Sequence, residues 1–416
     1  MNDIIKNIFN PCSGYFFLWM IYLMQGTLYE AGSYLSQTTL LIILLISLWH
    51  AFFIFSRKHT PAYFKGLNFL VLMYTVYGIL LFFTDGWITQ GKSLQPLSMN
   101  YLKSYYISLL PIYSSFYYTK KGYLNEKSFK MWILIFALVA TLEYYRNARE
   151  VMEAMISGDV DGIVNNIGYI FLSLIPCMLL FRKNLIIGYI GLAYCMYFII
   201  MGMKRGAIII GVIAVMLFIW FSMKSAKGIQ RIGVTLLVGI SLAIFSSFIT
   251  NTMMENDFFM GRVEKTMEGY SSGREEIYSS LWNNLIEETN PVTLFFGSGA
   301  NGTLKIADNY AHNDWLEIIT NQGILGIVFF LLYWFYFWRT LRCKKISQYA
   351  RNTLFMIFTI YFIKTLFSMS INDMSIYVNS MFGYALADGF RGDIIRYNHV
   401  QHYNKKNKAR IKILRA

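Results

Sequence analysis

The stretch 251–321 holds a histidine and an arginine whose chemistry suits the transfer of a group carried on an anion. His312 stands in the run Tyr310-Ala-His-Asn-Asp-Trp-Leu-Glu317, and Arg274 stands in Ser271-Ser-Gly-Arg-Glu275. Histidine is the usual side chain for taking a proton from a hydroxyl near neutral pH. An arginine fork matches the oxygens of a phosphate. The stretch therefore predicts a site where a hydroxyl reacts beside a phosphate, although a lone histidine is more often structural.

An amphipathic helix is expected to position Arg274. Ser272 followed by Glu275 has the spacing of a capping box, so the helix should start near Gly273. Its apolar residues recur at helical period and should lie on the rest of the molecule; they are Ile277, Tyr278, Leu281, Trp282 and Leu285. The first turn of a helix already favours an anion, so Arg274 could complete a phosphate cradle there. A surface pair with Glu268 or Glu276 is the alternative.

A glycine-rich run follows, Gly297-Ser-Gly-Ala-Asn-Gly302, after the strand-like Val292–Phe296. It has the GxGxxG spacing, but no βαβ unit surrounds it and the next clear helix is some ten residues away. We therefore reject a dinucleotide site. A turn that lets the backbone approach a ligand or a neighbouring helix is sufficient.

Neither a metal site nor a disulfide framework is predicted. His312 is the only histidine in 251–321, and no cysteine lies there. A zinc site needs several such ligands close together. The four cysteines form no CxxC pair; they are Cys12, Cys177, Cys195 and Cys343.

The composition is that of a polytopic membrane protein. Of 416 residues, 56% are hydrophobic and only 14% are charged, against about 25% charged in soluble domains. The net charge of +14 is better explained by basic cytoplasmic loops beside anionic lipid than by nucleic-acid binding.

The fold class expected is all-α, with about twelve membrane-spanning helices and one large loop. About 20 apolar residues cross a bilayer as a helix. The predicted spans are 13–29, 36–56, 67–83, 102–119, 128–145, 165–181, 184–202, 206–222, 232–250, 322–339, 352–370 and 374–390. The predicted organisation is spans one to nine in 1–250, a catalytic loop in 251–321, spans ten to twelve in 322–390, and a basic tail in 391–416.

The distribution of lysine and arginine gives an orientation. Basic residues gather in alternate loops, which places both termini in the cytoplasm and 251–321 on the outer face. The turn Met203-Lys204-Arg205-Gly206 is also outside, against the charge rule. Lys204 and Arg205 either reach lipid headgroups or serve the site, and the sequence does not decide between these.

At this point the chain resembles a known family. His312-Asn-Asp-Trp-Leu-Glu317, followed by Gly323-Ile-Leu-Gly326 and an apolar span, resembles the hallmark of the O-antigen ligase and O-antigen polymerase superfamily. Met203–Ile208 is similar to its arginine motif. Ser272–Glu275 and the glycine-rich Phe296–Gly302 are also similar to family features. The detailed resemblance covers about 201–330.

The resemblance implies a membrane glycosyltransferase with a GT-C-like helical fold. Such an enzyme takes a glycan from undecaprenyl pyrophosphate to an acceptor hydroxyl without a metal or other cofactor. Arg205 and Arg274 would bind the pyrophosphate, and His312 would act as base or position the acceptor. Further substrate-binding residues are Lys204, Tyr310, which would stack on a sugar, and Glu317, which would orient His312; helix capping or packing is the plainer role for the last two.

A polysaccharide polymerase in the bacterial cytoplasmic (inner) membrane is the favoured function. Its partners would be a lipid-linked oligosaccharide, membrane lipid and, by family resemblance, a chain-length regulator. The outer loop is compact and carries no added soluble domain. A ligase that transfers the chain to lipid A core or protein is the alternative. A transporter is disfavoured because no repeat is evident and charge within the spans is sparse, with Lys364, close to Asp373, as the main candidate.

Overall fold

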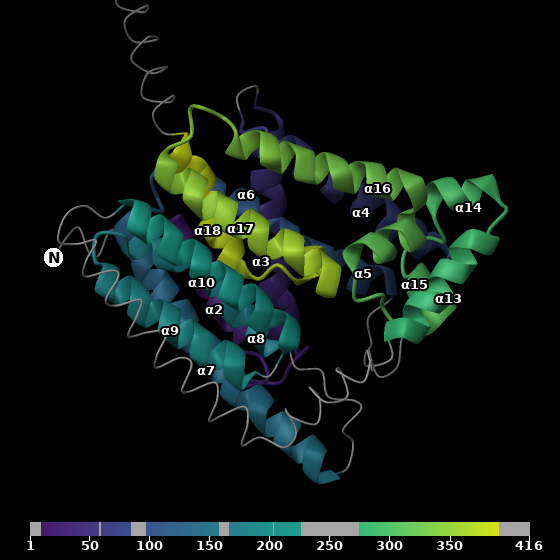
Figure 1. The fold of residues 1–416 in the computed structure, drawn as a ribbon, viewed down its shortest axis with the longest axis horizontal. Coiled ribbons are helices and arrows are strands. Elements are labelled where there is room, and N and C mark those ends of the chain that lie inside the picture. The colour runs from purple at the N-terminus through teal and green to yellow at the C-terminus, as the bar shows by residue number, and fades with distance from the viewer. Residues whose placement is uncertain are drawn as a thin grey trace, which may run out of the picture.

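The chain forms a bundle of helices (Figure 1). The computed structural model describes residues 10–57, 60–84, 97–157, 166–202, 204–225 and 274–390. Within these segments there is no β-strand, and a single isolated bridge joins Gln25 and Tyr29. The predicted helical class is therefore confirmed for this part of the chain.

The described segments consist mainly of helices. In chain order they are α2 (Pro11–Leu23), α3 (Tyr34–Phe55), α4 (Tyr63–Thr84), α5 (Leu97–Leu109), α6 (Pro111–Lys121), α7 (Glu126–Ser157), α8 (Ile167–Leu174), η1 (Ile175–Phe181), α9 (Leu185–Met201), α10 (Arg205–Ser225), α13 (Arg274–Glu287), α14 (Pro291–Phe296), α15 (Gly302–Ala307), α16 (Asp314–Leu341), α17 (Gln348–Phe367), η2 (Ile371–Asp373) and α18 (Ile376–Gly389).

Five of these helices are long and apolar enough to cross a membrane. They are α3, α4, α7 over Glu126–Arg149, α10 and α16, and each contains most or all of a predicted span. The helices α2 and α9, and α8 together with η1, are apolar but shorter. The predicted span 232–250 and the tail 391–416 lie outside the described residues. The count of twelve spans therefore stays a prediction.

Three predicted spans differ from the helices observed. The span 102–119 is two helices, because Pro111 lacks the N–H that would continue α5 and instead begins α6. The span 13–29 contains a helix only to Leu23, after which the chain turns at Gly26. The span 374–390 contains the 14-residue α18, which is too short to cross a bilayer.

The short α18 forms the centre of the bundle. Almost all of its side chains are buried, and it packs between α6 and α17. The Asn379 amide donates a hydrogen bond to the Ser108 carbonyl at 2.8 Å, which satisfies a polar group inside the core. A helix buried in this way supports its neighbours and does not face lipid.

Helices α4 and α16 form one of the most closely packed pairs in the bundle. The two pack closely along their lengths. At one end the Tyr63 amide donates to Thr340 Oγ1 at 2.8 Å. At the other end the Tyr77 hydroxyl donates to the Phe296 carbonyl, and it lies 3.4 Å from the Gln322 carbonyl. The pair is thus antiparallel, and the start of α16 lies beside the end of α4.

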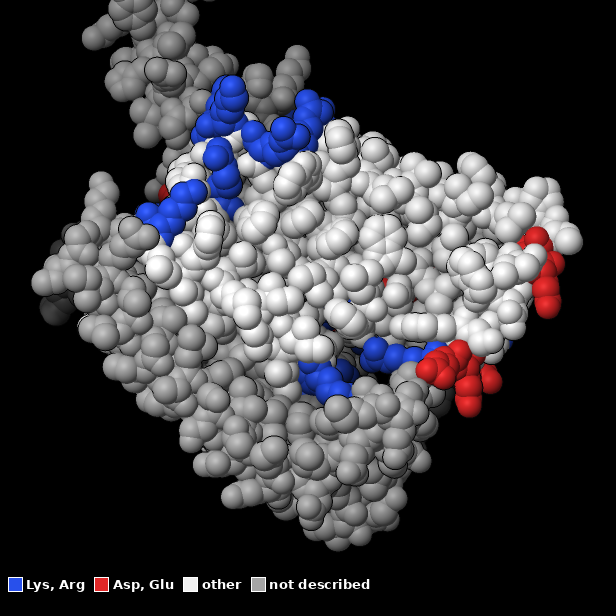
Figure 2. All heavy atoms as spheres, viewed as in Figure 1, with Lys and Arg blue, Asp and Glu red and all other residues white. Residues whose placement is uncertain are grey.

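Apolar side chains cover the outside of the bundle between two polar ends. Each of the five long helices exposes large apolar residues; examples are Trp49, Phe83, Leu138, Trp220 and Phe335. Figure 2 shows basic side chains gathered over the end of α16 and the start of α17, and a second basic group at a hollow near the starts of α10 and α13. The surface between them on this face carries almost no charge. This pattern is that of a multi-pass membrane protein.

Candidate functional site

The start of α16 is tied to the end of α17. Asn313 caps α16, since its Oδ1 accepts the Trp315 amide at 2.9 Å and the Leu316 amide at 3.1 Å. The Asn313 amide group also donates to the Leu366 carbonyl at 3.3 Å, and Trp315 Nε1 donates to Thr365 Oγ1 at 2.9 Å. His312 directly precedes this cap, so the same contacts fix where its backbone leaves the helix.

Asp314 strengthens this junction from the other side. Its carboxylate is buried, and Oδ2 accepts the Ser370 amide at 2.8 Å and the Ile371 amide at 3.3 Å. The carboxylate therefore binds the chain just after α17 to the first residue of α16. The ends of the two helices form one rigid corner beside His312.

Glu317 holds the segment that leads into His312. The buried Oε1 accepts from Thr303 Oγ1 and from Asn321 Nδ2, both at 2.7 Å. Oε2 accepts the Ala311 amide at 2.8 Å. Glu317 thus joins α15, α16 and the residue before His312, and it positions the histidine through the backbone.

The glycine-rich turn closes a break in α16. Gly323 has φ +64° inside this helix, so the helical hydrogen bonds stop there. The Ser298 amide donates to the Thr320 carbonyl at 2.8 Å, and the Gly299 amide donates to the Asn321 carbonyl at 3.0 Å. A Cβ on Gly297 would lie 2.4 Å from the Asn321 carbonyl. The glycine-rich run therefore lets the backbone approach α16 closely. The Ser298 and Gly299 amides bond to α16 carbonyls and not to a ligand.

Arg274 begins α13 and reaches across to α17. Its Nη1 donates to the carbonyl of Phe367, the last residue of α17, at 2.9 Å. Cations are favoured at this carbonyl end of a helix. Arg274 makes no ion pair with Glu276 in the structure, and Glu268 lies outside the described residues. One hydrogen bond leaves most of the guanidinium fork able to meet a ligand.

The amino groups of Lys204 and Lys364 both lie near the ring of Tyr169. Lys204 Nζ lies 5.9 Å from the Tyr169 ring centroid and donates to Asn166 Oδ1 at 3.2 Å. Lys364 Nζ lies 4.3 Å from the same centroid and pairs with Asp373 at 2.5 Å. The predicted neighbourhood of Lys364 and Asp373 is thus observed. Tyr169 gathers positive charge at the end of the bundle that holds His312.

His312 lies within reach of two of these cations. It is partly buried, with φ +51° in the left-handed region. Burial lowers the pKa of His312 below its ordinary value, and the positive charges of Arg274 and Lys204 lower it further. The imidazole is therefore neutral at neutral pH, which is the form that accepts a proton.

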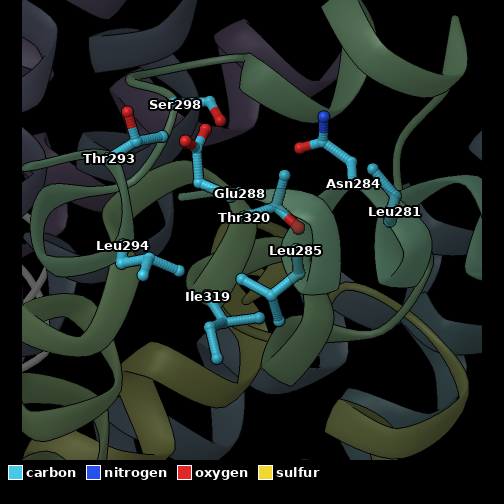
Figure 3. Close-up of a pocket in the computed structure, with 9 residues that line it drawn as sticks. All are labelled: Leu281, Asn284, Leu285, Glu288, Thr293, Leu294, Ser298, Ile319 and Thr320. Atoms are coloured by element: carbon cyan, nitrogen blue, oxygen red, sulfur yellow. The ribbon is translucent and has the colours of Figure 1, made fainter. Parts of the chain in front are cut away.

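A small hollow, open to solvent, lies at the surface between α13, α14 and α16. Figure 3 shows its polar wall, with Glu288, Thr293 and Ser298 among the side chains, and its apolar wall, with Leu285, Leu294 and Ile319. Thr320, also in the lining, has a buried hydroxyl without a hydrogen-bond partner in the part of the chain described. Such mixed walls suit a ligand with hydroxyl groups and a carbon ring.

A comparison with known protein families matches the part of the chain that builds this region. A family model described as O-antigen ligase matches residues 190–331. This match supports a relationship of the segment to the O-antigen polymerase and ligase superfamily. No curated protein matches the chain.

The superfamily segment contains all six residues predicted for the site. It runs from within α9 to within α16. Arg274 and Asn313, the residue after His312, bond to the neighbouring carbonyls of Phe367 and Leu366, so Arg274 lies near His312. The positive charges of Arg274 and Lys204 both lower the pKa of His312. Burial raises the pKa of Tyr310, and the negative charge of Glu317 raises it further, so these two also lie at this junction.

The other predicted residues occupy this region with different contacts. Arg205 is partly buried at the first position of α10, directly after Lys204. The side chain of Tyr310 is 37% exposed, which leaves its ring open to a ligand. Glu317 accepts no hydrogen bond from His312, because Thr303, Asn321 and Ala311 occupy its oxygens. These contacts give Glu317 the packing role that the sequence analysis held to be the plainer interpretation.

Two local expectations were wrong and one was confirmed. Residues Val292–Phe296 lie in helix α14, where Asn290 accepts the Val292 amide and Pro291 begins the helix. The next helix, α15, begins at Gly302 inside the glycine-rich run. The amphipathic helix is confirmed as α13, which begins at Arg274 with Leu281 fully buried, but Trp282 is 55% exposed. Ser272 and its capping box lie outside the described residues.

Sequence reasoning missed several residues that build the site. Asn313 could have been found, because an asparagine just before a helical pattern is a cap signal. Asp314 also lies in the same motif, but its partners at 370–371 are far away in the chain. Tyr169 gives no signal in the sequence, since an aromatic residue in an apolar run is ordinary.

Proposed function

We propose that the chain is a polysaccharide polymerase acting at the outer face of the cytoplasmic membrane. It would transfer a glycan from undecaprenyl pyrophosphate to a hydroxyl of a lipid-linked repeat unit. The superfamily supports the broad class, a membrane glycan polymerase or ligase. The observation that carries the proposal is that Arg274 and Asn313, the residue after His312, bond to neighbouring carbonyls at the end of α17, which brings a cation beside His312.

The proposed reaction needs one base and one anion site. His312 takes the proton of the acceptor hydroxyl, and the oxygen forms a bond to the anomeric carbon of the donor sugar. The bond from that carbon to the pyrophosphate oxygen breaks, and undecaprenyl pyrophosphate leaves with the electron pair. Arg274, Arg205 and Lys204 stabilise the charge on the leaving group. The proposal assigns no step to a metal ion.

We place the donor or acceptor sugar against the surface around the small hollow between α13, α14 and α16. Its residue Leu281 lies seven positions after Arg274, which is about 10 Å along α13. Thr320 lies six positions after Asp314, about 9 Å along α16. Because His312 and Arg274 stand at the starts of these two helices, a sugar in the hollow would be near the proposed reacting atoms.

Genetic complementation tests this function. The gene is deleted in its native host and replaced by wild type, His312→Ala, Arg205→Ala or Arg274→Ala at matched expression. Lys344→Ala is the control, because Lys344 is an exposed cation after the far end of α16. Loss of a general base lowers a rate by about 10²–10⁴-fold. We expect the three site variants to lose the surface glycan ladder and the control to retain it.

The deletion phenotype separates the candidate activities. Lipid or core that carries a single repeat unit indicates a polymerase. Long polymer left on undecaprenyl pyrophosphate indicates a ligase. A normal ladder from all three site variants would refute this site and reopen the transporter hypothesis.

A further inference from the structure

A second basic pocket lies at the opposite end of the bundle from His312. It is a shallow surface pocket, open to solvent, between the ends of α3 and α6. Its lining is Phe53, Ile54, Arg57, Phe116, Tyr117, Lys120 and Lys121. The adjoining helix α4 begins at Tyr63, whose amide is bonded to Thr340 near the end of α16. His312 precedes the start of α16, so this pocket is remote from the proposed transferase site.

The cations of this pocket lie over aromatic rings. The Arg57 guanidinium carbon is 4.1 Å from the Phe53 ring centroid. Lys120 Nζ is 5.6 Å from the Phe116 centroid, and Lys121 Nζ is 5.9 Å from the Tyr117 centroid. These contacts place three positive charges around an apolar floor.

The aromatic wall is itself fixed by buried contacts. Tyr117 stacks on His50 with centroids 4.2 Å apart and meets Phe53 edge-on at 5.3 Å. His50 Nδ1 lies 3.1 Å from Ser114 Oγ, a hydrogen bond that ties α3 to α6. The pocket is therefore built before any ligand arrives, which lowers the entropy cost of binding.

No acidic side chain neutralises these cations within the described residues. Neither Arg57, Lys120 nor Lys121 makes an ion pair there. The next carboxylate along the chain, Glu126, pairs with Lys130 at 2.7 Å instead. Three like charges held together favour a bound anion.

The pocket also opens at an edge of the bundle where apolar side chains of α3 are exposed. Helix α3 packs mainly on α2 and α6, which leaves its other sides uncovered by the described residues. Phe52 is 68% exposed and Phe55 is 70% exposed on this helix. A ligand here can place a charged group among the cations and a hydrocarbon chain against α3.

We propose that the pocket between α3 and α6 binds an anionic phospholipid. The headgroup phosphate meets Arg57, Lys120 and Lys121, and an acyl chain lies along the apolar face of α3. Basic pockets between spanning helices bind acidic lipid headgroups in this way. The lipid joins the loop after α3 to the last turn of α6 and serves no step of the transfer reaction.

Native mass spectrometry of the purified full chain in detergent tests this site. The probes are phosphatidylglycerol and phosphatidylcholine with the same acyl chains. The test variant is Arg57→Gln with Lys120→Gln and Lys121→Gln. The control, Arg339→Gln with Arg342→Gln and Lys344→Gln, removes three basic side chains at the same end of the bundle. Each basic group near an anionic headgroup contributes about fivefold, so we expect about a hundredfold weaker phosphatidylglycerol binding in the test variant alone.

Other results would overturn the proposal. Equal binding of phosphatidylcholine, or equal loss in both triple variants, would show general adhesion of lipid. Displacement of phosphatidylglycerol by stoichiometric glycerol phosphate would show a site for free anions. If the triple variant does not fold, the single change Lys121→Glu replaces it, because Lys121 is exposed. An unchanged affinity in that variant would contradict the lipid site.

Discussion

The backbone at His312 is held in a conformation that a histidine rarely adopts. Its φ of +51° lies in the left-handed region, where histidine is less strained than bulkier residues but still uncommon. Contacts on both sides keep it there. Glu317 binds the Ala311 amide, and Asn313 binds the first amides of α16 together with the Leu366 carbonyl. These contacts fix the backbone on both sides of His312, and a fixed backbone would suit the base proposed above.

The titration of His312 should reveal the cations around it. Because burial and the charges of Arg274 and Lys204 lower its pKa, its protonation midpoint should lie below the ordinary value of about 6.5. Lys204→Gln removes one positive charge, so the midpoint should move to higher pH. NMR of protein with ¹³C-labelled histidine measures this, with His312→Gln to assign the signal. Lys305→Gln is the control in the same segment. A midpoint that Lys204→Gln leaves in place, or that Lys305→Gln moves as much, contradicts the proposed geometry.

Glu317→Gln should damage the site without touching a substrate. Both Glu317 oxygens accept hydrogen bonds, from the Thr303 hydroxyl, the Asn321 side-chain amide and the Ala311 backbone amide. The amide group of glutamine would face one of these donors, which costs about 1–3 kcal/mol. We expect faster proteolysis between α15 and α16 and a weaker glycan ladder. Glu287→Gln, which alters an exposed carboxylate of α13, is the matched control. Equal behaviour of the two variants would show that Glu317 does not organise this segment.

At the scale of helices, the sequence predicts elements whose cause is local. The helical period and acidic first turn of α13 are visible in its own residues, and the interruption near 321–323 is visible in Asn321-Gln-Gly323. Burial of a whole helix is decided by distant partners. The sequence of α18 alone does not predict that α6 and α17 enclose it. The aromatic run before Gly297 likewise suggests a strand, but the Asn290 cap and Pro291 select a short helix.

The break in α16 gives a test of the glycine-rich turn. Gly323 has a backbone conformation that other residues avoid, and an added Cβ would lie 2.5 Å from the Gly297 nitrogen. Strain of this kind costs about 1–3 kcal/mol before the steric overlap is counted. Gly323→Ala should therefore lower the melting temperature in detergent and reduce the glycan ladder.

The control for this change is Gly14→Ala in α2. A Cβ there meets no atom within 4 Å and the residue is helical, so alanine should stabilise by about 0.5–1 kcal/mol. Equal melting temperatures for Gly323→Ala and wild type would mean that the turn and α16 do not meet as described.

At the scale of the whole molecule, the two basic regions lie at opposite ends of an apolar body. The site end holds His312 with Arg274 and Lys204, and the far end holds the basic residues after α16. The part of α16 after the break at Gly323, residues 324–341, runs towards the far end; a straight helix of this length measures about 27 Å, close to the thickness of a bilayer core. Lysine and arginine prefer the cytoplasmic side of a membrane. The loop after α16, which contains Lys344 and Lys345, should therefore lie in the cytoplasm.

Cysteine labelling should therefore distinguish the two ends. The residues Asn309 and Lys344 are exposed before and after α16. In a Cys343→Ser background, Asn309→Cys should react with a membrane-impermeant maleimide in intact spheroplasts. Lys344→Cys should react only after the membrane is opened, because the bilayer separates it from the reagent. The three remaining cysteines are buried and should stay silent. The reverse labelling pattern would place His312 in the cytoplasm, away from glycans on the outer leaflet, and labelling of both positions in intact spheroplasts would mean that α16 does not span the membrane.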